Sequence, residues 1–155
     1  MNELVYRNLS EDAMRQICAW KYGGEYDLYN LPSYEEMQVR QIGFMNPQRE
    51  KNYYGFWDES ILVGFVNILE EKEEVFIGIG VNPDLCNKHY GQRMLSITYE
   101  ISKKLYPDKP LYLEVRTWNI RAVKCYQKAG FRIDGQAYEL TTGIGTGTFY
   151  RMIRE

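Results

Sequence analysis

The sequence predicts a mixed α/β fold, in which a mostly antiparallel, twisted sheet of about seven strands has helices on both faces. The main observation is that strand-like and helix-like segments mix along the chain in the order β-α-α-β-β-β-α-β-α-β-β. A second is that 45% of the 155 residues are hydrophobic, which is enough to bury a core. A third is the lack of any linker, repeat or low-complexity stretch. Residues 1–155 are therefore predicted to form a single domain.

The first half of the chain contains two expected helices. Residues 4–9 resemble a strand, and Ser10 followed by two acidic residues predicts the start of a helix that ends at Gly23 and Gly24. Ser33 begins a capping-box pattern, which predicts a second short helix. Further strands are expected at residues 53–57, 61–69 and 75–81. The last of these is a continuous apolar run, as expected for a strand covered on both faces.

The second half continues the alternation. Hydrophobic residues at helical spacing predict a helix over residues 91–105. A shorter helix is expected over residues 119–128, closed by Gly130 at the position that a helix C-terminus prefers. Strands are expected at residues 111–116, 133–140 and 148–153. A turn rich in Gly and Thr joins the last two strands.

Composition excludes several classes of protein. The net charge is −2, which argues against broad electrostatic binding to nucleic acid. No apolar run is long enough to span a membrane, and the first ten residues lack the apolar core of an export signal, so a cytoplasmic location is expected. The cysteines, at positions 18, 86 and 125, are odd in number and far apart, which argues against a disulfide framework. One histidine, His89, cannot build a zinc site with them, and no metal is expected.

Two neighbouring segments carry the chemistry. The loop between strand 75–81 and helix 91–105 is expected to present free backbone N–H groups at a helix N-terminus, which suits a pyrophosphate. A loop that only starts a helix explains the same pattern. On the next strand and helix, Glu114 and Tyr126 place a carboxylate near a phenol, and Asn119 shares the helix face of Tyr126.

The stretch LEVRTWNIRAVKCYQKAGF, residues 113–131, resembles the strand–helix signature of the GNAT superfamily of N-acetyltransferases. The LEVR-x-x-N spacing is most similar to the branch that acetylates the N-terminal alanine of ribosomal proteins. The clear match covers residues 75–131. The resemblance implies the GNAT fold, transfer of an acetyl group from acetyl-CoA to a primary amine by direct attack, and no metal. It is compatible with a homodimer through the C-terminal strands.

The resemblance also implies which residues bind acetyl-CoA. Those expected at the acetyl-pantetheine arm are Ile79, Gly80, Val81 and Asn119. Those expected around the pyrophosphate are Asn87, Lys88, His89, Tyr90, Gly91 and Gln92. Cys86 and His89 depart from the pattern of the family's phosphate loop, and His89 stands where the family has a glycine that lets the backbone approach the pyrophosphate.

The implied catalytic residues are Glu114, as the base that deprotonates the amine, and Tyr126, as the acid that protonates the leaving thiolate. Each has a simpler interpretation. Glu114 is also explained as a polar strand residue paired with an arginine, with Glu74 the rival base. Tyr126 is also explained by core packing. Asn119 is also explained as the N-cap of its helix.

The acceptor site is expected near an aromatic-rich segment. Tyr26 and Tyr29, on the Gly-flanked loop 22–32, are predicted to line the acceptor pocket, although packing of the N-terminal helices explains them equally well. The acceptor amine is a small molecule or a protein N-terminus. Two other functions remain open at this stage, namely a non-catalytic acyl-CoA-binding protein and a protein-interaction module.

Overall fold

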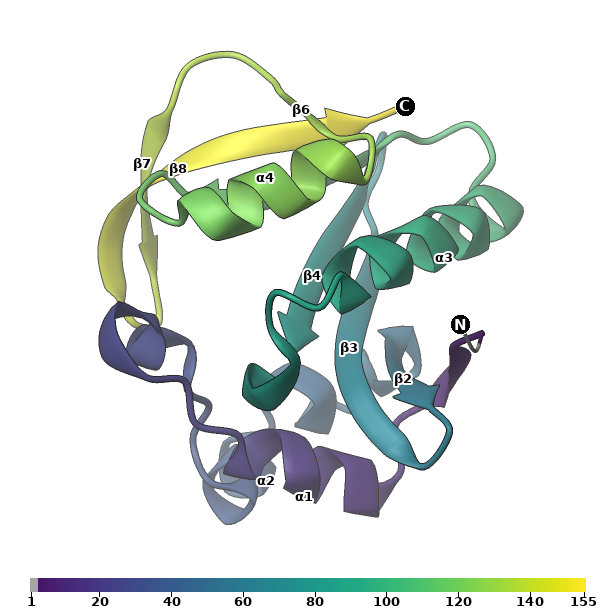
Figure 1. The fold of residues 1–155 in the computed structure, drawn as a ribbon, viewed down its shortest axis with the longest axis vertical. Coiled ribbons are helices and arrows are strands. Elements are labelled where there is room, and N and C mark those ends of the chain that lie inside the picture. Colours follow the sequence, from purple (N-terminus) through teal and green to yellow (C-terminus); the bar gives the residue numbers. More distant parts are fainter. Residues whose placement is uncertain (1–2) are drawn as a thin grey trace. The chain divides into compact units, whose positions relative to one another are not determined.

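The computed structural model describes residues 3–155 (Figure 1). The α-helices in this range are α1 (Glu11–Ala19), α2 (Tyr34–Arg40), α3 (Tyr90–Leu105) and α4 (Ile120–Lys128). The strands are β1 (Val5–Asn8), β2 (Tyr53–Asp58), β3 (Ile61–Glu70), β4 (Val75–Val81), β5 (Leu111–Arg116), β6 (Arg132–Ile133), β7 (Tyr138–Thr142) and β8 (Gly145–Arg154). Short 3-10 helices occur at η1 (Gly24–Tyr29), η2 (Gly43–Met45), η3 (Glu50–Asn52) and η4 (Pro83–Leu85).

The eight strands of the described chain belong to one hydrogen-bonded sheet in the order β1-β2-β3-β4-β5-β8-β6, with β7 also paired to β8. The pairing is mostly antiparallel, whereas β4 and β5 run parallel. The predicted α/β class is confirmed. The sheet has one strand more than the approximate prediction, because the segment expected as one strand over residues 133–140 is interrupted near Gly135, whose φ is +78°.

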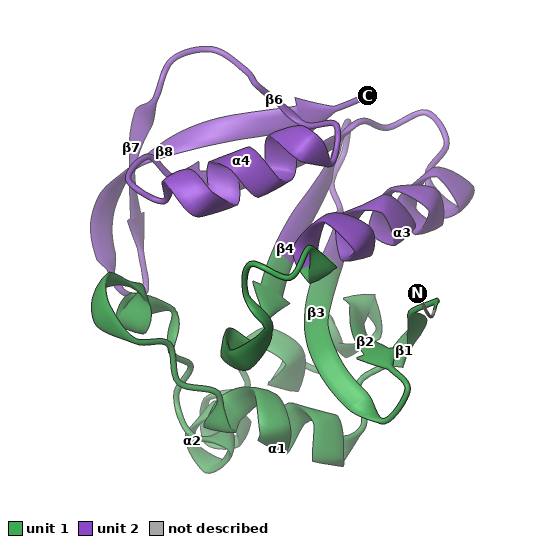
Figure 2. Cartoon of the chain, viewed as in Figure 1, with its two compact units in different colours: residues 1–67, 79–90 green, residues 68–78, 91–155 purple. Residues whose placement is uncertain are grey.

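The chain divides into two compact units (Figure 2). Unit 1 comprises the residues up to Asn67 together with Ile79–Tyr90, and unit 2 comprises Ile68–Gly78 and Gly91–Glu155. Strands β3 and β4 are each shared between the units. The single domain expected over residues 1–155 stays a prediction.

Unit 1 is organised around α1 and an aromatic-rich core. Ser10 caps α1, because its hydroxyl oxygen accepts a hydrogen bond from the N–H of Ala13 at 3.1 Å. The predicted end at Gly23 and Gly24 is wrong: α1 stops at Ala19, where the extended backbone of Trp20 leaves the helix. The residues that follow form η1 instead. The core of this unit contains Ala13, Ile17, Cys18, Met37, Phe44, Trp57 and Leu62.

The second predicted cap is confirmed. The hydroxyl oxygen of Ser33 accepts a hydrogen bond from the N–H of Glu36 at 3.2 Å at the start of α2.

The expectation that residues 75–81 are covered on both faces is wrong. Only Val75 and Ile77 of this strand are buried, and its second half is partly exposed.

Unit 2 shows the alternation expected of a strand with one covered face. Leu111, Leu113 and Val115 of β5 are buried, whereas Tyr112 and Glu114 lie on the other face and are half-buried. Helix α4 ends as predicted, with Gly130 just beyond it at a φ of +95°. The last turn is shorter than expected, because β7 and β8 extend to Thr142 and Gly145.

Candidate active site

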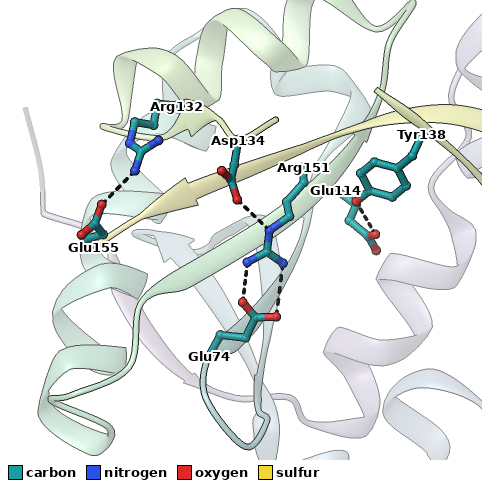
Figure 3. A network of polar contacts seen from close by, with 7 residues as sticks. All are labelled: Glu74, Glu114, Arg132, Asp134, Tyr138, Arg151 and Glu155. Carbon is teal, nitrogen blue, oxygen red and sulfur yellow. Dashed lines mark hydrogen bonds and ion pairs between the residues drawn. The ribbon is translucent and has the colours of Figure 1, made fainter. Parts of the chain in front are cut away.

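Glu114 lies in the middle of β5 and points toward Tyr138 of β7 (Figure 3). The hydroxyl of Tyr138 donates a hydrogen bond to Glu114 Oε2 at 2.6 Å. Burial, and then this bond to the carboxylate, raise the pKa of Tyr138 above its ordinary value. The hydroxyl therefore keeps its proton at neutral pH and remains a donor.

Glu74, the rival base, is held in an ion pair (Figure 3). Arg151 of β8 donates to both of its carboxylate oxygens, and the bond from Nη1 to Oε2 measures 3.2 Å. Arg151 Nε also donates to Asp134 Oδ2 at 3.2 Å. The bonds with Glu74, ahead of the bond with Asp134, raise the pKa of Arg151, so the guanidinium stays charged. Both oxygens of Glu74 are thus occupied by a permanent cation.

Tyr112 extends this polar face of unit 2. Its hydroxyl donates to Glu71 Oε1 at 2.8 Å, and its ring lies 4.3 Å from the guanidinium carbon of Arg151. Its ring also meets that of Phe76 edge to face, with 5.5 Å between centroids. Burial is the first cause of a raised pKa at Tyr112, which therefore also stays protonated. Each of the two tyrosines on this face donates to a different glutamate.

Asn119 and Tyr126 come from α4 of unit 2. Asn119 is 7% exposed, and its Oδ1 accepts a hydrogen bond from the N–H of Ala122 at 3.2 Å, which makes it the N-cap of the helix. This bond uses the amide oxygen of Asn119. Tyr126 is half-buried, seven residues further along the same helix.

Parallel pairing of β4 with β5 occurs near the start of both strands. Val75 pairs with Leu111, and Phe76 pairs with Tyr112. Within the described part of unit 2, the register does not continue to Ile77 and Gly78.

In unit 1, Asn82 anchors the loop that follows β4. Its N–H donates to the carbonyl oxygen of Val63 at 2.8 Å, and its Nδ2 donates to that of Leu62 at 3.1 Å. Its Oδ1 accepts from the N–H of Asp84 at 3.0 Å. The loop is therefore fastened to β3 before it reaches the expected phosphate-binding residues.

The backbone of this loop takes an unusual course. Asn87 and His89 both have a φ of +66°, in the left-handed region. Asn tolerates that region, whereas glycine is favoured there over most side chains. His89 thus has a φ that glycine would adopt at this position without strain. Asn87, Lys88 and His89 are all exposed at the start of α3.

Helix α3 begins at Tyr90, whose hydroxyl donates to Asp58 Oδ2 at 2.6 Å and ties the loop to the end of β2. The first N–H groups of an α-helix have no partner within the helix. Those of α3 include Gly91 and Gln92, which belong to unit 2. Gly91 is buried and Gln92 is half-buried. N–H donors at a helix N-terminus suit the diphosphate of a coenzyme A molecule.

The aromatic loop of unit 1 is closed by Tyr22 and Asn30. The N–H of Tyr22 donates to Asn30 Oδ1, and its hydroxyl donates to the carbonyl oxygen of Val81, both at 2.6 Å. Tyr26 and Tyr29 lie between them in η1 and are half-buried. The loop that carries the two predicted acceptor residues is thus attached to the last residue of β4.

Gly80 lies one residue earlier, beside Ile79, on the same strand. A Cβ atom at Gly80 would lie 2.4 Å from Cε1 of Phe65, which is closer than van der Waals contact allows. A side chain at Gly80 would therefore force the Phe65 ring to move. The family resemblance placed Gly80 at the acetyl-pantetheine arm of the cofactor and gave no sign of this second constraint from Phe65.

The predicted residues are thus found in two groups. Unit 2 holds Glu114, Asn119, Tyr126, Gly91 and Gln92. Unit 1 holds Tyr26, Tyr29, Ile79, Gly80, Val81, Asn87, Lys88, His89 and Tyr90. Sequence reasoning missed the side chains that hold these residues in place, namely Tyr138, Tyr22 and Asp58. No motif marks them, because each acts on a residue far away in the chain.

Other chemistries have little support. The three cysteines are free, and burial raises the pKa of the Cys18 and Cys125 thiols, which disfavours the reactive thiolate. Among residues 3–155, no group of three or more His, Cys, Asp or Glu side chains could hold a metal ion. In the same range, every helix is too short or too polar to cross a membrane.

Solved structures with the same fold are found across nearly the whole chain. Spermidine N-acetyltransferase from Vibrio cholerae, in complex with CoA and spermine, is 18% identical at a TM-score of 0.76, over 97% of this chain and 94% of its own. A GNAT-family acetyltransferase from Bacillus anthracis is 18% identical at 0.76, over 98% and 94%. The ribosomal-protein-S18-alanine N-acetyltransferase from Escherichia coli is 17% identical at 0.68, over 97% and 92%.

At these identities the structures show a common fold. No curated protein sequence matches the chain closely enough to add to this. The family model of the acetyltransferase (GNAT) family, however, matches residues 12–131, which is most of the chain. The match includes the strand, loop and helix from which the resemblance was first drawn. The chain therefore belongs to the GNAT family of acetyltransferases.

Proposed function

We propose that the protein transfers an acetyl group from acetyl-CoA to a primary amine by direct attack, with Glu114 as the base and Tyr126 as the acid. In this reaction the amine nitrogen forms a bond to the acetyl carbon, and the bond from that carbon to sulfur breaks. Glu114 takes a proton from the ammonium form of the amine, and Tyr126 gives one to the leaving thiolate. The second proton of the attacking nitrogen passes to the tyrosinate, which restores the phenol and leaves one proton for Glu114 to release to solvent. A base is needed because amines with a pKa of about 8 to 10 are mostly protonated at neutral pH.

The observation that carries the proposal is that Glu74 and Glu114, both in unit 2, have different hydrogen-bond partners. Arg151 donates to both oxygens of Glu74, and each of the two side chains is 28% exposed. Glu74 would have to break this ion pair before it could act as a base. Among the contacts of residues 3–155, Glu114 has only Oε2 engaged, by a neutral hydroxyl. A carboxylate bound by a neutral donor on one side retains an oxygen that can accept a proton.

Acetyl-CoA is the donor we propose, held by the residues around the end of β4 and the start of α3. The left-handed His89 and the N-terminal N–H groups of α3 fit the diphosphate. Gly80 and Asn119 would contact the pantetheine arm. The acceptor is a small-molecule amine or a protein N-terminus, and it would enter beside Tyr26 and Tyr29. The spermine complex of the Vibrio cholerae enzyme supports testing polyamines first.

The test is acetyl transfer to an amine panel that contains spermidine and a peptide with N-terminal alanine, followed by product mass. Glu114→Gln and Tyr126→Phe should each lower kcat by about a hundredfold, within the usual range of general acid–base catalysis. The matched control is Glu74→Gln, which removes a carboxylate of the same unit and should leave kcat nearly unchanged in the folded protein. A full rate in Glu114→Gln, or a large loss only in Glu74→Gln, would contradict the assignment of the base.

A further inference from the structure

We infer that Tyr138 is a positioning residue for the proposed base: its hydroxyl holds Glu114 by Oε2 and leaves Oε1 to receive the proton of the amine. The inference rests on the proposed function, because it presumes that Glu114 is the base. Nothing in the sequence pattern assigns a role to Tyr138, which lies 24 residues beyond Glu114 on a different strand.

The geometry is specific. Tyr138 pairs with Phe149 on β8, and Glu114 pairs with Arg151 on the same strand, so the Tyr138 side chain reaches across the face of β8 (Figure 3). The distance of 2.6 Å lies in the range of a charge-assisted O–H···O⁻ bond. Among residues 3–155, no donor to Glu114 Oε1 is present in the described contacts.

This bond fixes a flexible side chain. A glutamate has three side-chain torsions, and a single short bond to one oxygen restricts where the other oxygen can point. Burial, and then the bond with Glu114, raise the pKa of Tyr138, so it acts as a donor across the neutral range and does not compete for the amine's proton. The hydroxyl therefore orients the base without replacing it.

The same bond should also stabilise Glu114 in its charged form, because the hydroxyl of Tyr138 donates to the carboxylate. The other ionisable groups of unit 2 on this face are Tyr112, Glu71, Glu74, Asp134 and Arg151. Arg151 is paired with Glu74 and Asp134, and its single positive charge offsets one of their two negative charges. Removal of the Tyr138 hydroxyl should thus affect the proposed base mainly through loss of its hydrogen bond to Glu114.

The experiment is the pH profile of kcat/KM for Tyr138→Phe. The acid limb, which reports the proposed base, should move up by about one pH unit, as expected for loss of a hydrogen bond to a charged group. The kcat should fall and the KM for acetyl-CoA should stay constant. Tyr112→Phe is the matched control, because it removes a hydroxyl on the same face that is bound to Glu71 instead. It should leave the acid limb in place.

An unmoved acid limb in Tyr138→Phe, or an equal shift in Tyr112→Phe, would overturn the inference. Glu114→Gln separates this outcome from failure of the proposed function. If Glu114→Gln is inactive but Tyr138→Phe shows no shift, only the role of Tyr138 is wrong; if Glu114→Gln is fully active, both are wrong. Should Tyr138→Phe fail to fold, 3-fluorotyrosine at position 138 replaces it. This stronger donor should move the acid limb down, and no movement would refute the inference.

Discussion

Gly80 offers a sharp test of the structure, because two reasons for a glycine coincide there. The first is the close approach that the family resemblance implies for the pantetheine arm. The second is the ring of Phe65, which would lie 2.4 Å from a Cβ at Gly80. Gly80→Ala is the smallest change that adds this atom, and it is expected to destabilise unit 1.

The magnitude follows from the overlap. Ordinary contact begins at 3.4 Å, so the ring would have to retreat by the difference, 3.4 − 2.4 = 1.0 Å. Other rings surround it: the ring centroids of Trp20, Phe44 and Tyr53 lie 6.3, 6.4 and 6.4 Å from that of Phe65. A side chain packed in this way cannot move freely. Overpacking of this kind costs about 1–3 kcal/mol.

The assay is urea unfolding of four proteins, namely wild type, Gly80→Ala, Phe65→Leu and the double variant. Leucine lacks the ring atoms nearest to Gly80, so Phe65→Leu should relieve the overlap at the cost of lost aromatic packing. The double variant should be more stable than the sum of the two single effects predicts, by about 1–2 kcal/mol. In thermal unfolding, Gly80→Ala alone should lower Tm by about 4–8 °C, since about 2 kcal/mol is lost in a domain of this size.

Additive effects in this cycle would refute the reasoning, because they would mean that Phe65 does not exclude the Cβ. The KM for acetyl-CoA in the same proteins separates the two roles of the glycine. If the double variant regains stability but keeps a raised KM, Gly80 also serves the cofactor. If the KM returns to that of Phe65→Leu, the ring alone explains the glycine.

The remaining predictions concern the cap, the loop and the acceptor. Asn119→Ala should lose about 1 kcal/mol of stability with its cap and raise the KM for acetyl-CoA, whereas Asn119→Asp should keep the cap and raise the KM alone. An unchanged KM in the Asp variant would leave Asn119 as a cap only. His89→Gly should be more stable than His89→Ala by about 1 kcal/mol in urea unfolding, because only glycine adopts the positive φ without penalty. Tyr26→Ala and Tyr29→Ala should raise the acceptor KM about tenfold and the acetyl-CoA KM much less; equal effects on both would place these rings in the core.

The parts of the fold that sequence predicted well are those with a strong local cause. Ser10 and Ser33 cap helices because their hydroxyls reach an N–H three residues on, and Gly130 follows a helix where a positive φ is needed. The predicted end of α1 was wrong because a tertiary contact outweighed the local signal. Gly23 and Gly24 are strong breakers, but Trp20 leaves the helix earlier and packs against the core, a tertiary effect that the local pattern does not contain.

The candidate site shows a similar division. The alternation of β5 predicted correctly that Glu114 lies on the face opposite Leu113. The alternation could not show which of Glu114 and Glu74 is the better candidate for the base, because that depends on hydrogen-bond partners that are distant in sequence. Arg151 reaches Glu74 from 77 positions away, and Tyr138 reaches Glu114 from 24. Two carboxylates of the same unit acquire different chemistry from a cation in one case and a neutral hydroxyl in the other.

His89 shows that residue types alone are a poor guide to the backbone conformation of the expected phosphate-binding loop. The family pattern has glycine at this position, and the substitution suggested weaker contact with the pyrophosphate. The backbone at His89 nevertheless takes a φ of +66°, and Asn87 takes the same value two residues earlier. Backbone N–H groups, which depend on this conformation, supply the donors for a phosphate. Asn82 fastens one side of the loop to β3, and Tyr90 fastens the other to Asp58. These anchors help to hold His89 in a conformation that glycine adopts without strain and that other residues rarely adopt.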